Sequence, residues 1–170
     1  VKRVIDHVGM PDDAASHAHY LSEFLDIYTS APAKFTTVFD HVHEVLTDFQ
    51  SSGIALGLCT NKPEAPTNVV LDAFGLTTFF GSIVGGDRLP SRKPDPAMLH
   101  LVMKELAVEN CLFVGDSEVD VATAKAAGVP FALFTRGYRQ TPVAELAPDF
   151  EFDHFKNLPA IAAPFFASIA

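Results

Sequence analysis

The sequence predicts an α/β fold in which helices cover both faces of a parallel sheet. Short apolar runs alternate with helical patterns over most of the 170 residues, and the runs are apolar throughout, as in strands buried on both faces. Hydrophobic residues make up 48% of the chain and charged residues 19%, a composition that excludes a disordered chain. Because successive strand–helix–strand units cross over with one hand, the strands are expected to run parallel around one core.

The first part of the chain is predicted to be helical. From His17 to Tyr28, apolar side chains recur at helical spacing and form one amphipathic face. A second helical pattern runs from Val38 to Phe49 and stops at Gly53, a residue type that is common just past a helix end. Two helices are therefore expected before the first strand.

The alternating part of the chain begins with the apolar run Ile54–Cys59, which ends in the polar residues TNK. Behind it, Pro63–Phe74 followed by Gly75 has the pattern of a helix with its C-terminal stop. The predicted strands are 54–59, 82–86, 111–116, 130–135 and 150–152, and the later predicted helices are 95–107, 117–128 and a final helix.

Charge and cysteine content limit the class of partner and the compartment. The net charge of -9 argues against a nucleic-acid surface, because phosphate backbones are bound by clustered Lys and Arg. No run approaches the ~18 apolar residues of a spanning helix, and the start of the sequence lacks the apolar core of a signal peptide. Cys59 and Cys111 each lie inside an apolar run, which favours free thiols over a disulfide. We expect a soluble, cytoplasmic protein that binds neither nucleic acid nor membrane.

In parallel sheets of this kind, ligands bind beyond the carboxyl ends of the strands. The polar residues at those predicted ends are Thr60 and Asn61, residues 85–87, Asp116 and Ser117, and residues 135–138. Position alone is weak support, since polar residues follow strands in any such fold. The chemistry of the side chains carries more weight.

Two carboxylates lie where the predicted strand 111–116 gives way to a helix. Asp116 and Asp120 are four residues apart, so both face one side of the first helical turn. Mg²⁺ prefers oxygen ligands and keeps several waters, so one or two carboxylates and a substrate phosphate suffice as its site. The alternative is that Asp116 caps the helix and Asp120 is a solvated acid in its first turn.

Three further side chains are suited to binding a phosphate. Lys93 lies in the loop SRKPDPAML and is followed by Pro94 and Pro96. These prolines restrict the backbone that presents the Lys93 ammonium. Thr60 and Asn61 offer a hydroxyl and an amide as donors to phosphoryl oxygens. Each also has an ordinary interpretation, as a surface lysine or as a helix cap.

In order and spacing, these residues resemble the haloacid dehalogenase-type phosphatases, and most closely the phosphoglycolate phosphatases among them. The matching motifs are TNK at residues 60–62, GGDRLPSRKPDPAML at 85–99 and VGDSEVD at 114–120. The stretch AKAAGVPFALFTRGY, which ends in Gly137 and Tyr138, also resembles the family. The resemblance implies a HAD-like Rossmannoid three-layer sandwich, with residues 38–170 as the hydrolase core and residues 1–37 as a partial, truncated helical cap.

The resemblance also implies a reaction and a role for each residue. Thr60, Asn61 and Lys93 would bind the phosphate of a small phosphorylated metabolite, for which 2-phosphoglycolate is the implied substrate. Asp116 would ligate Mg²⁺, and Asp120 would support the metal site and the lysine through hydrogen bonds. Hydrolysis would pass through an aspartyl-phosphate, and the protein is expected to be a monomer or a homodimer.

One family motif is absent from the sequence. The family opens with a strand that ends in Asp-x-Asp-Gly-Thr, whose first Asp attacks phosphorus, but no two aspartates here are two positions apart. In the family's sheet that strand lies between the strand of Thr60 and the strand of Asp116. Its absence would leave buried backbone groups unpaired at about 1 to 3 kcal/mol each. We therefore expect the nucleophile to lie outside these 170 residues, and the chain alone to be inactive.

Three other functions are compatible with parts of the same pattern, and the sequence disfavours one of them. A related β-phosphoglucomutase-like or other phosphatase activity fits the same motifs, since caps select the substrate. A noncatalytic module could keep the phosphate pocket without turnover. A receiver-type signalling domain also gathers acids, a Thr and a Lys at strand ends, but Lys93 precedes the strand of Asp116 here, and that order disfavours a receiver.

Overall fold

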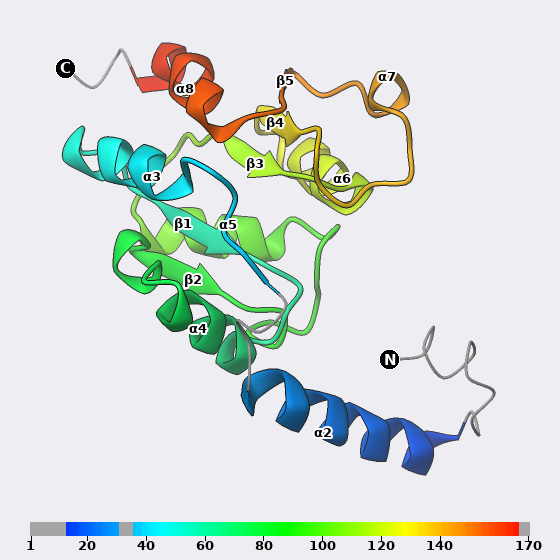
Figure 1. Cartoon of the computed structure of the whole chain (residues 1–170). Helices are drawn as coiled ribbons and strands as arrows, with labels where there is room; N and C mark the ends of the chain where they lie inside the picture. Colours follow the sequence, from blue (N-terminus) through cyan, green and yellow to red (C-terminus); the bar gives the residue numbers. More distant parts are fainter. Residues whose placement is uncertain (1–12, 31–35, 167–170) are drawn as a thin grey trace.

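The computed structural model describes residues 13–30 and 36–166, and it shows two small parallel sheets between layers of helices (Figure 1). One sheet pairs β1 (Gly57–Cys59) with β2 (Ser82–Val84). The other has the order β3-β4-β5, with β3 at Phe113–Gly115, β4 at Phe131–Phe134 and β5 at Phe150–Phe152. The five predicted strands are thus confirmed with their parallel direction, and most are shorter than predicted.

Most of the predicted helices are confirmed. The helices are α2 (Ala14–Ser30), α3 (Val42–Ser51), α4 (Glu64–Ala73), α5 (Ala97–Glu105), α6 (Glu118–Ala127), α7 (Val143–Leu146) and α8 (Leu158–Phe166). The short helix α7 and two 3-10 turns, η1 (Thr77–Phe79) and η2 (Phe155–Asn157), were not predicted. All three are too short for a period of 3.6 residues to show in the sequence.

The second predicted helix begins later than its apolar pattern suggests. Residues 36–39 are irregular, and α3 starts at Val42 after His41, whose φ of 65° lies in the left-handed region. Phe39 has left the helical face and its ring lies 4.8 Å from the Phe134 ring and 5.9 Å from the Phe155 ring. The prediction of a helix from Val38 was therefore wrong at its start, because packing on β4 outweighed the local pattern.

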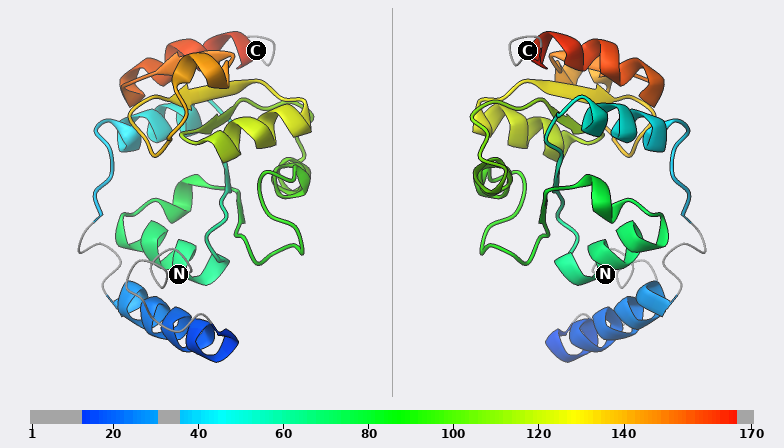
Figure 2. Two further views of the ribbon diagram at one scale, coloured as in Figure 1. Left: turned by 90° about the vertical axis from the view of Figure 1, so that its right-hand side faces the viewer. Right: turned by 90° about the vertical axis from the view of Figure 1, so that its left-hand side faces the viewer.

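Helix α2 belongs to the segment expected to be a partial cap. It begins after Asp13, whose carboxylate accepts hydrogen bonds from the Ser16 backbone amide and hydroxyl at 2.8 and 3.0 Å. It contacts α4 and lies at one end of the molecule, opposite α8 (Figure 2). Residues 1–12 and 31–35 lie outside the described part, so the division into cap and core at residue 37 stays a prediction.

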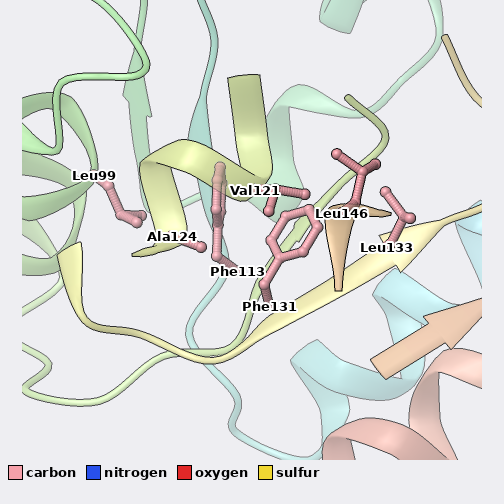
Figure 3. Close-up of a cluster of buried hydrophobic side chains, with 7 residues drawn as sticks. All are labelled: Leu99, Phe113, Val121, Ala124, Phe131, Leu133 and Leu146. Carbon is pink, nitrogen blue, oxygen red and sulfur yellow. The ribbon is translucent and has the colours of Figure 1, made fainter. Parts of the chain in front are cut away.

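Side chains of the β3-β4-β5 sheet alternate between two clusters, one on each face. On one face Phe113, Phe131 and Leu133 pack with Val121 and Ala124 of α6, together with Leu99 and Leu146 (Figure 3). On the other face Ala132, Phe134 and Phe152 pack with Val45 of α3 and Leu158 of α8. The arrangement has three layers, as the sequence predicted.

The β1–β2 pair is joined to the rest through two helices. On one side, α5 places Met98 and Val102 against Val84 of β2 and Leu99 in the cluster of β3 and β4. On the other side, α3 packs with α8 and also contacts η1, where the His43 ring lies 6.0 Å from the Phe79 ring. Helix α5 therefore contacts both sheets, and α3, on the opposite face, links the larger sheet to the η1 turn before β2.

No hydrogen-bonded pairing joins β1 to β3 in the described part of the chain. Each of these strands has a paired neighbour on one side only, β2 for β1 and β4 for β3. Their burial differs accordingly, since every residue of the doubly flanked β4 is buried whereas Leu58 and Val114 are only half-buried. The direct pairing that would have contradicted an intervening strand is not present.

Both cysteines are free and half-buried, as predicted. Burial raises the pKa of the Cys59 thiol to about 11, and the Lys93 ammonium acts in the opposite direction. Among the described helices, none combines the length and apolar character that crossing a bilayer requires.

Candidate active site

The candidate site is built where loops leave the carboxyl ends of β1, β2 and β3. Thr60 follows β1 directly, and its backbone amide still donates to the Val84 carbonyl of β2 at 3.1 Å. Lys93 lies in the loop between β2 and α5, and Asp116 follows β3 at the start of α6. The parallel direction of the strands brings these three loops to one edge.

A buried ion pair connects two of these loops. The Lys93 Nζ lies 2.6 Å from Asp120 Oδ1, with side chains 11% and 8% exposed. The ammonium also lies 5.7 Å from the centroid of the Phe113 ring of β3, within the range of a cation–π contact. The ammonium is thus fixed at the strand edge, rather than extending freely from the surface as in the ordinary interpretation of Lys93.

The second oxygen of Asp120 closes the turn at the start of α6. Oδ2 accepts from the Ser117 hydroxyl at 2.7 Å and from the Asp116 and Ser117 backbone amides at 3.1 and 3.2 Å. The Ser117 hydroxyl in turn accepts from the Asp120 amide, which completes a capping box. Asp120 is therefore buried and hydrogen-bonded through both oxygens, and the interpretation as a solvated acid does not hold.

Opposing effects act on the pKa of Asp120. Burial by itself raises the pKa of this carboxyl, but the Lys93 ammonium and the hydrogen bonds from Ser117 and the Asp116 amide lower it more. The net result is a pKa below the ordinary value for aspartate. The carboxylate therefore stays ionised at neutral pH.

The Asn61 side chain is engaged by the loop that carries Lys93. Its Nδ2 donates to the Lys93 carbonyl at 3.0 Å, and its Oδ1 accepts from the Lys93 backbone amide at 2.9 Å. Because an amide nitrogen carries two hydrogens, one donor of Asn61 remains for a ligand. Asn61 therefore ties the strand end of Thr60 to the lysine loop, a contact that its expected role as a phosphate donor did not include.

Gly86 permits the close approach of these two loops. Its backbone amide donates to the Lys62 carbonyl at 2.8 Å, and its carbonyl accepts from Arg92 Nε at 2.5 Å. A Cβ at this position would overlap the Asn61 backbone carbonyl. Only glycine allows the turn after β2 to lie so near the residues that follow β1.

Thr60 keeps donor capacity at the same edge. Its hydroxyl oxygen accepts from the Lys62 backbone amide at 3.2 Å. Within the part of the chain that the structure describes, no acceptor is found for the hydroxyl hydrogen of Thr60. A hydroxyl in this state can donate to an oxygen of a bound anion.

Asp116 presents one free carboxylate oxygen. Its Oδ2 accepts from the Tyr138 backbone amide at 2.8 Å, and the described residues offer no partner to its Oδ1. Within residues 13–30 and 36–166, no three His, Cys, Asp or Glu side chains are grouped as metal ligands. A single carboxylate oxygen nevertheless fits Mg²⁺, which is commonly held by one or two carboxylates, waters and substrate phosphate.

Two residues of the turn were assigned no role from the sequence. Ser117 forms the capping box, for which the spacing S-x-x-D was an available signal. Glu118 accepts from the Gln140 and Thr141 backbone amides at 2.5 and 2.6 Å. The pKa of Glu118 is lowered to about 2, first by the hydrogen bond from the Thr141 backbone amide and then by those from the Glu118 and Gln140 backbone amides. No sequence pattern indicated this contact, which joins segments far apart in the chain.

Two cavities lie elsewhere on the molecule. One of about 390 Å³ lies between α7 and β5, and another of about 250 Å³ lies beside Phe39, Arg136 and His154. Neither is lined by Thr60, Lys93 or Asp116. The candidate site is accordingly defined by its polar contacts.

Comparison with known proteins agrees with the fold and the motifs. A phosphoglycolate phosphatase of Cereibacter sphaeroides is 45% identical over 159 residues, which cover 94% of this chain and 73% of that protein. A phosphoglycolate phosphatase of Rhodospirillum rubrum is 44% identical over 149 residues, covering 86% of this chain and 61% of that protein. A solved structure described as a predicted phosphoglycolate phosphatase from Haemophilus somnus 129PT is similar with a TM-score of 0.87 at 28% identity, covering 95% of this chain and 73% of that one.

The fold and the edge at which its polar side chains gather define an α/β protein whose candidate ligand site lies beyond the carboxyl ends of parallel strands. Residues 2–134 match the family of haloacid dehalogenase-like hydrolases. The chain belongs to that family, and the resemblance drawn from its three motifs is confirmed.

Proposed function

We propose that this chain forms most of a Mg²⁺-dependent phosphatase that hydrolyses a small phosphomonoester, with 2-phosphoglycolate as the expected substrate. The supporting observation is the buried contact of Lys93 with Asp120, which in turn holds the backbone of Asp116. This contact ties the Lys93 ammonium to the turn that carries the Asp116 carboxylate, whose Oδ1 has no partner among the described residues. The names of the relatives from Cereibacter sphaeroides and Rhodospirillum rubrum support the choice of substrate.

In the proposed reaction, a carboxylate attacks the phosphorus of the ester, and the second Asp of the Asp-x-Asp-Gly-Thr motif gives its proton to the alcohol as the P–O bond breaks. The same Asp regains a proton from water in the next step. Water then cleaves the resulting aspartyl-phosphate, which releases inorganic phosphate and restores the carboxylate. The Thr60 hydroxyl, the remaining Asn61 amide hydrogen and the Lys93 ammonium donate to the non-bridging oxygens throughout. These donors are held by the protein before the substrate binds, so little rearrangement opposes the reaction.

The metal would be held through Asp116, by the oxygen that the Tyr138 amide leaves free. Bound Mg²⁺ supplies charge neutralisation between the attacking carboxylate and the phosphate. Asp120 supports the site from behind, because its oxygens are already hydrogen-bonded to Lys93 and to the turn of Asp116. We propose that its part in metal binding is indirect.

The attacking carboxylate is proposed to lie in a segment outside these 170 residues, since no Asp-x-Asp-Gly-Thr occurs within them. We place the strand that carries it between β1 and β3. Two observations support this place. In the described part of the chain, β1 and β3 are each paired on one side only, and α5 contacts both sheets while α3 links the larger sheet to η1 on the opposite face. The 170 residues by themselves are therefore proposed to be inactive.

We further propose that the enzyme works in the cytoplasm on a small phosphorylated metabolite. Both thiols are free and half-buried, as is common in a reducing compartment. The net charge of -9 disfavours a polyanionic partner and leaves local binding of a small anion possible.

The test uses the intact enzyme, meaning these 170 residues together with the segment that carries the Asp-x-Asp-Gly-Thr motif. The gene is read upstream of Val1 for that motif, and phosphate release is then measured on 2-phosphoglycolate, hexose phosphates and pyrophosphate, with Mg²⁺ or with a chelator. The expected result is Mg²⁺-dependent turnover with the highest kcat/KM on 2-phosphoglycolate. Lys93→Met should lower kcat by about 100- to 1,000-fold.

The matched control is Lys104→Met, which removes an exposed lysine from the last turn of α5 and should leave kcat unchanged. Phosphate binding without turnover by any version of the protein would support a noncatalytic phosphate-binding module instead. Turnover by the 170 residues alone would contradict the placement of the nucleophile outside them.

A further inference from the structure

The loop after β4 lies directly over the turn that carries Asp116. Three backbone amides of this loop donate to side chains of the turn: Tyr138 to Asp116 Oδ2 at 2.8 Å, and Gln140 and Thr141 to Glu118 Oε1 at 2.5 and 2.6 Å. The loop and the turn are about 20 residues apart in the sequence, so these contacts are tertiary and not part of a local turn. The Glu118 carboxylate accepts two of these three hydrogen bonds and so anchors the loop.

Gly137 shows how closely the loop approaches the turn. A Cβ at this position would overlap the Asp116 side chain, meeting its Cβ, its Cγ and its Oδ2. No residue other than glycine fits there without displacing the carboxylate. The loop is thus fitted to one orientation of the Asp116 side chain.

The position of Glu118 is otherwise unfavourable for a site that binds an anion. A carboxylate in the first helical turn gains from the helix dipole, but it also adds negative charge close to where a phosphate would bind. Two backbone amides are directed at this carboxylate, and the described residues place no cation within ion-pair distance of it. Its contacts therefore indicate a role in holding the loop, rather than in binding the phosphate.

We propose that Glu118 is a positioning residue for Asp116. It anchors Gln140 and Thr141, and this anchoring keeps the Tyr138 amide on Asp116 Oδ2 and leaves Oδ1 as the single oxygen open to a cation. Glu118 touches neither substrate nor metal, and it acts only through the loop and Asp116. This inference rests on the proposed function in one respect, namely that Asp116 is the residue that holds Mg²⁺.

The first experiment is amide hydrogen exchange by NMR on the intact enzyme without metal or substrate, which requires no turnover. Glu118→Ala should raise the exchange rates of the Tyr138, Gln140 and Thr141 amides by about tenfold or more, because their acceptors are lost or loosened. Glu118→Gln keeps an oxygen acceptor and should raise them less. The matched control is Glu44→Ala, which removes an exposed first-turn acid from α3 and should leave these amides unchanged.

The second experiment measures Mn²⁺ binding to the intact enzyme by water-proton relaxation, with kcat and KM recorded on the same samples. Glu118→Ala should weaken Mn²⁺ binding by about 10- to 100-fold, the range seen when a hydrogen bond behind a ligand is removed. KM for the phosphoester at saturating metal should be unchanged, and Glu118→Gln should restore most of the metal affinity. If Glu118 contributed only to stability, Glu118→Ala would bind Mn²⁺ as tightly as the wild type, and Glu118→Gln would have no lost affinity to restore.

Each outcome decides the proposal. Unchanged exchange of the Tyr138 amide in Glu118→Ala would overturn it, as would faster exchange with unchanged Mn²⁺ affinity. Wild-type protein that binds no Mn²⁺ would overturn both this inference and the metal dependence of the proposed function. Wild-type protein that binds Mn²⁺ through Asp116 but hydrolyses no phosphoester would overturn the proposed function alone, and the positioning role would stand.

Discussion

The Lys93 ammonium and the Asp120 carboxylate form a buried ion pair, with 2.6 Å between Nζ and Oδ1. The pair joins the loop after β2 to the helix after β3. It therefore connects two segments that leave strands of separate sheets. Charges this far from solvent are retained only when they are paired and hydrogen-bonded. The same contact that fixes the cation at the candidate site therefore also holds the two halves of the molecule together.

Removal of the lysine charge should destabilise the protein strongly. Lys93→Met leaves the Asp120 carboxylate buried without its partner, and we expect the free energy of unfolding to fall by about 3 to 5 kcal/mol. Urea unfolding followed by circular dichroism measures this change. In the double variant Lys93→Met with Asp120→Asn no unpaired charge is left, so it should be more stable than Lys93→Met alone.

The control for this prediction is an exposed pair. His19 and Glu23 of α2 lie 3.8 Å apart, with side chains 65% and 59% exposed. Glu23→Gln should change the free energy of unfolding by no more than about 0.5 kcal/mol. If Lys93→Met were as mild as Glu23→Gln, the ion pair would not hold the two halves together.

The ion pair should also make stability depend on acid pH. The pKa of Asp120 in the folded state lies below its ordinary value of about 3.9. Its carboxylate therefore contributes stability that is fully present above about pH 3.9 and is lost as pH falls through the folded-state pKa. We expect the urea concentration at the unfolding midpoint to decrease as the pH is lowered below about 4, and to decrease more steeply in the wild type than in Asp120→Asn. Parallel pH curves for the two proteins would show that Asp120 has no lowered pKa.

Asn61 should contribute to stability through its two hydrogen bonds to the Lys93 backbone. Asn61→Ala removes both, and we expect a loss of about 1 to 3 kcal/mol in the free energy of unfolding. Asn61→Asp keeps the acceptor for the Lys93 amide and loses the donor to its carbonyl. In the intact enzyme both changes should lower kcat, because the loop that presents the ammonium is released. Full kcat in Asn61→Ala would rule out this role.

The fold was predictable because its signals are local. Apolar runs such as that around Phe131 and Leu133 mark strands buried on both faces, and Gly53 and Gly75 mark the ends of helices. The start of α3 was not predictable, since Phe39 leaves a helical pattern to pack against Phe134 and Phe155. Only the folded chain shows that this tertiary contact exceeds the local preference.

The candidate site was predictable in part. The motifs indicated that Thr60, Lys93 and Asp116 lie at one edge, because parallel strands end together. The sequence could not show that Asn61 binds the Lys93 backbone, or that Glu118 holds the loop after β4. Such contacts depend on the approach of loops that are distant in the chain, and no residue spacing encodes them.

The Cys59 thiol should react slowly, although it lies next to the candidate site. Burial raises its pKa to about 11, so only about one thiol in a thousand is ionised at pH 8. We expect alkylation by iodoacetamide, followed by mass spectrometry, to be about 100-fold slower at Cys59 than at a free model thiol. The rate should become ordinary once the protein is unfolded in urea. Rapid alkylation of the native protein would show that the thiol is neither buried nor raised in pKa.

We propose that Thr60, Lys93 and Asp116 surround one site for a doubly charged oxyanion. Crystals grown with Mg²⁺ and soaked with tungstate, a heavy-atom substitute for phosphate, test it through anomalous scattering. We expect a peak within hydrogen-bonding distance of the Thr60 hydroxyl and the Lys93 ammonium, beside the Asp116 carboxylate, and no such peak in Lys93→Met. Tungstate bound only elsewhere, or bound at this edge equally well without the lysine, would contradict it.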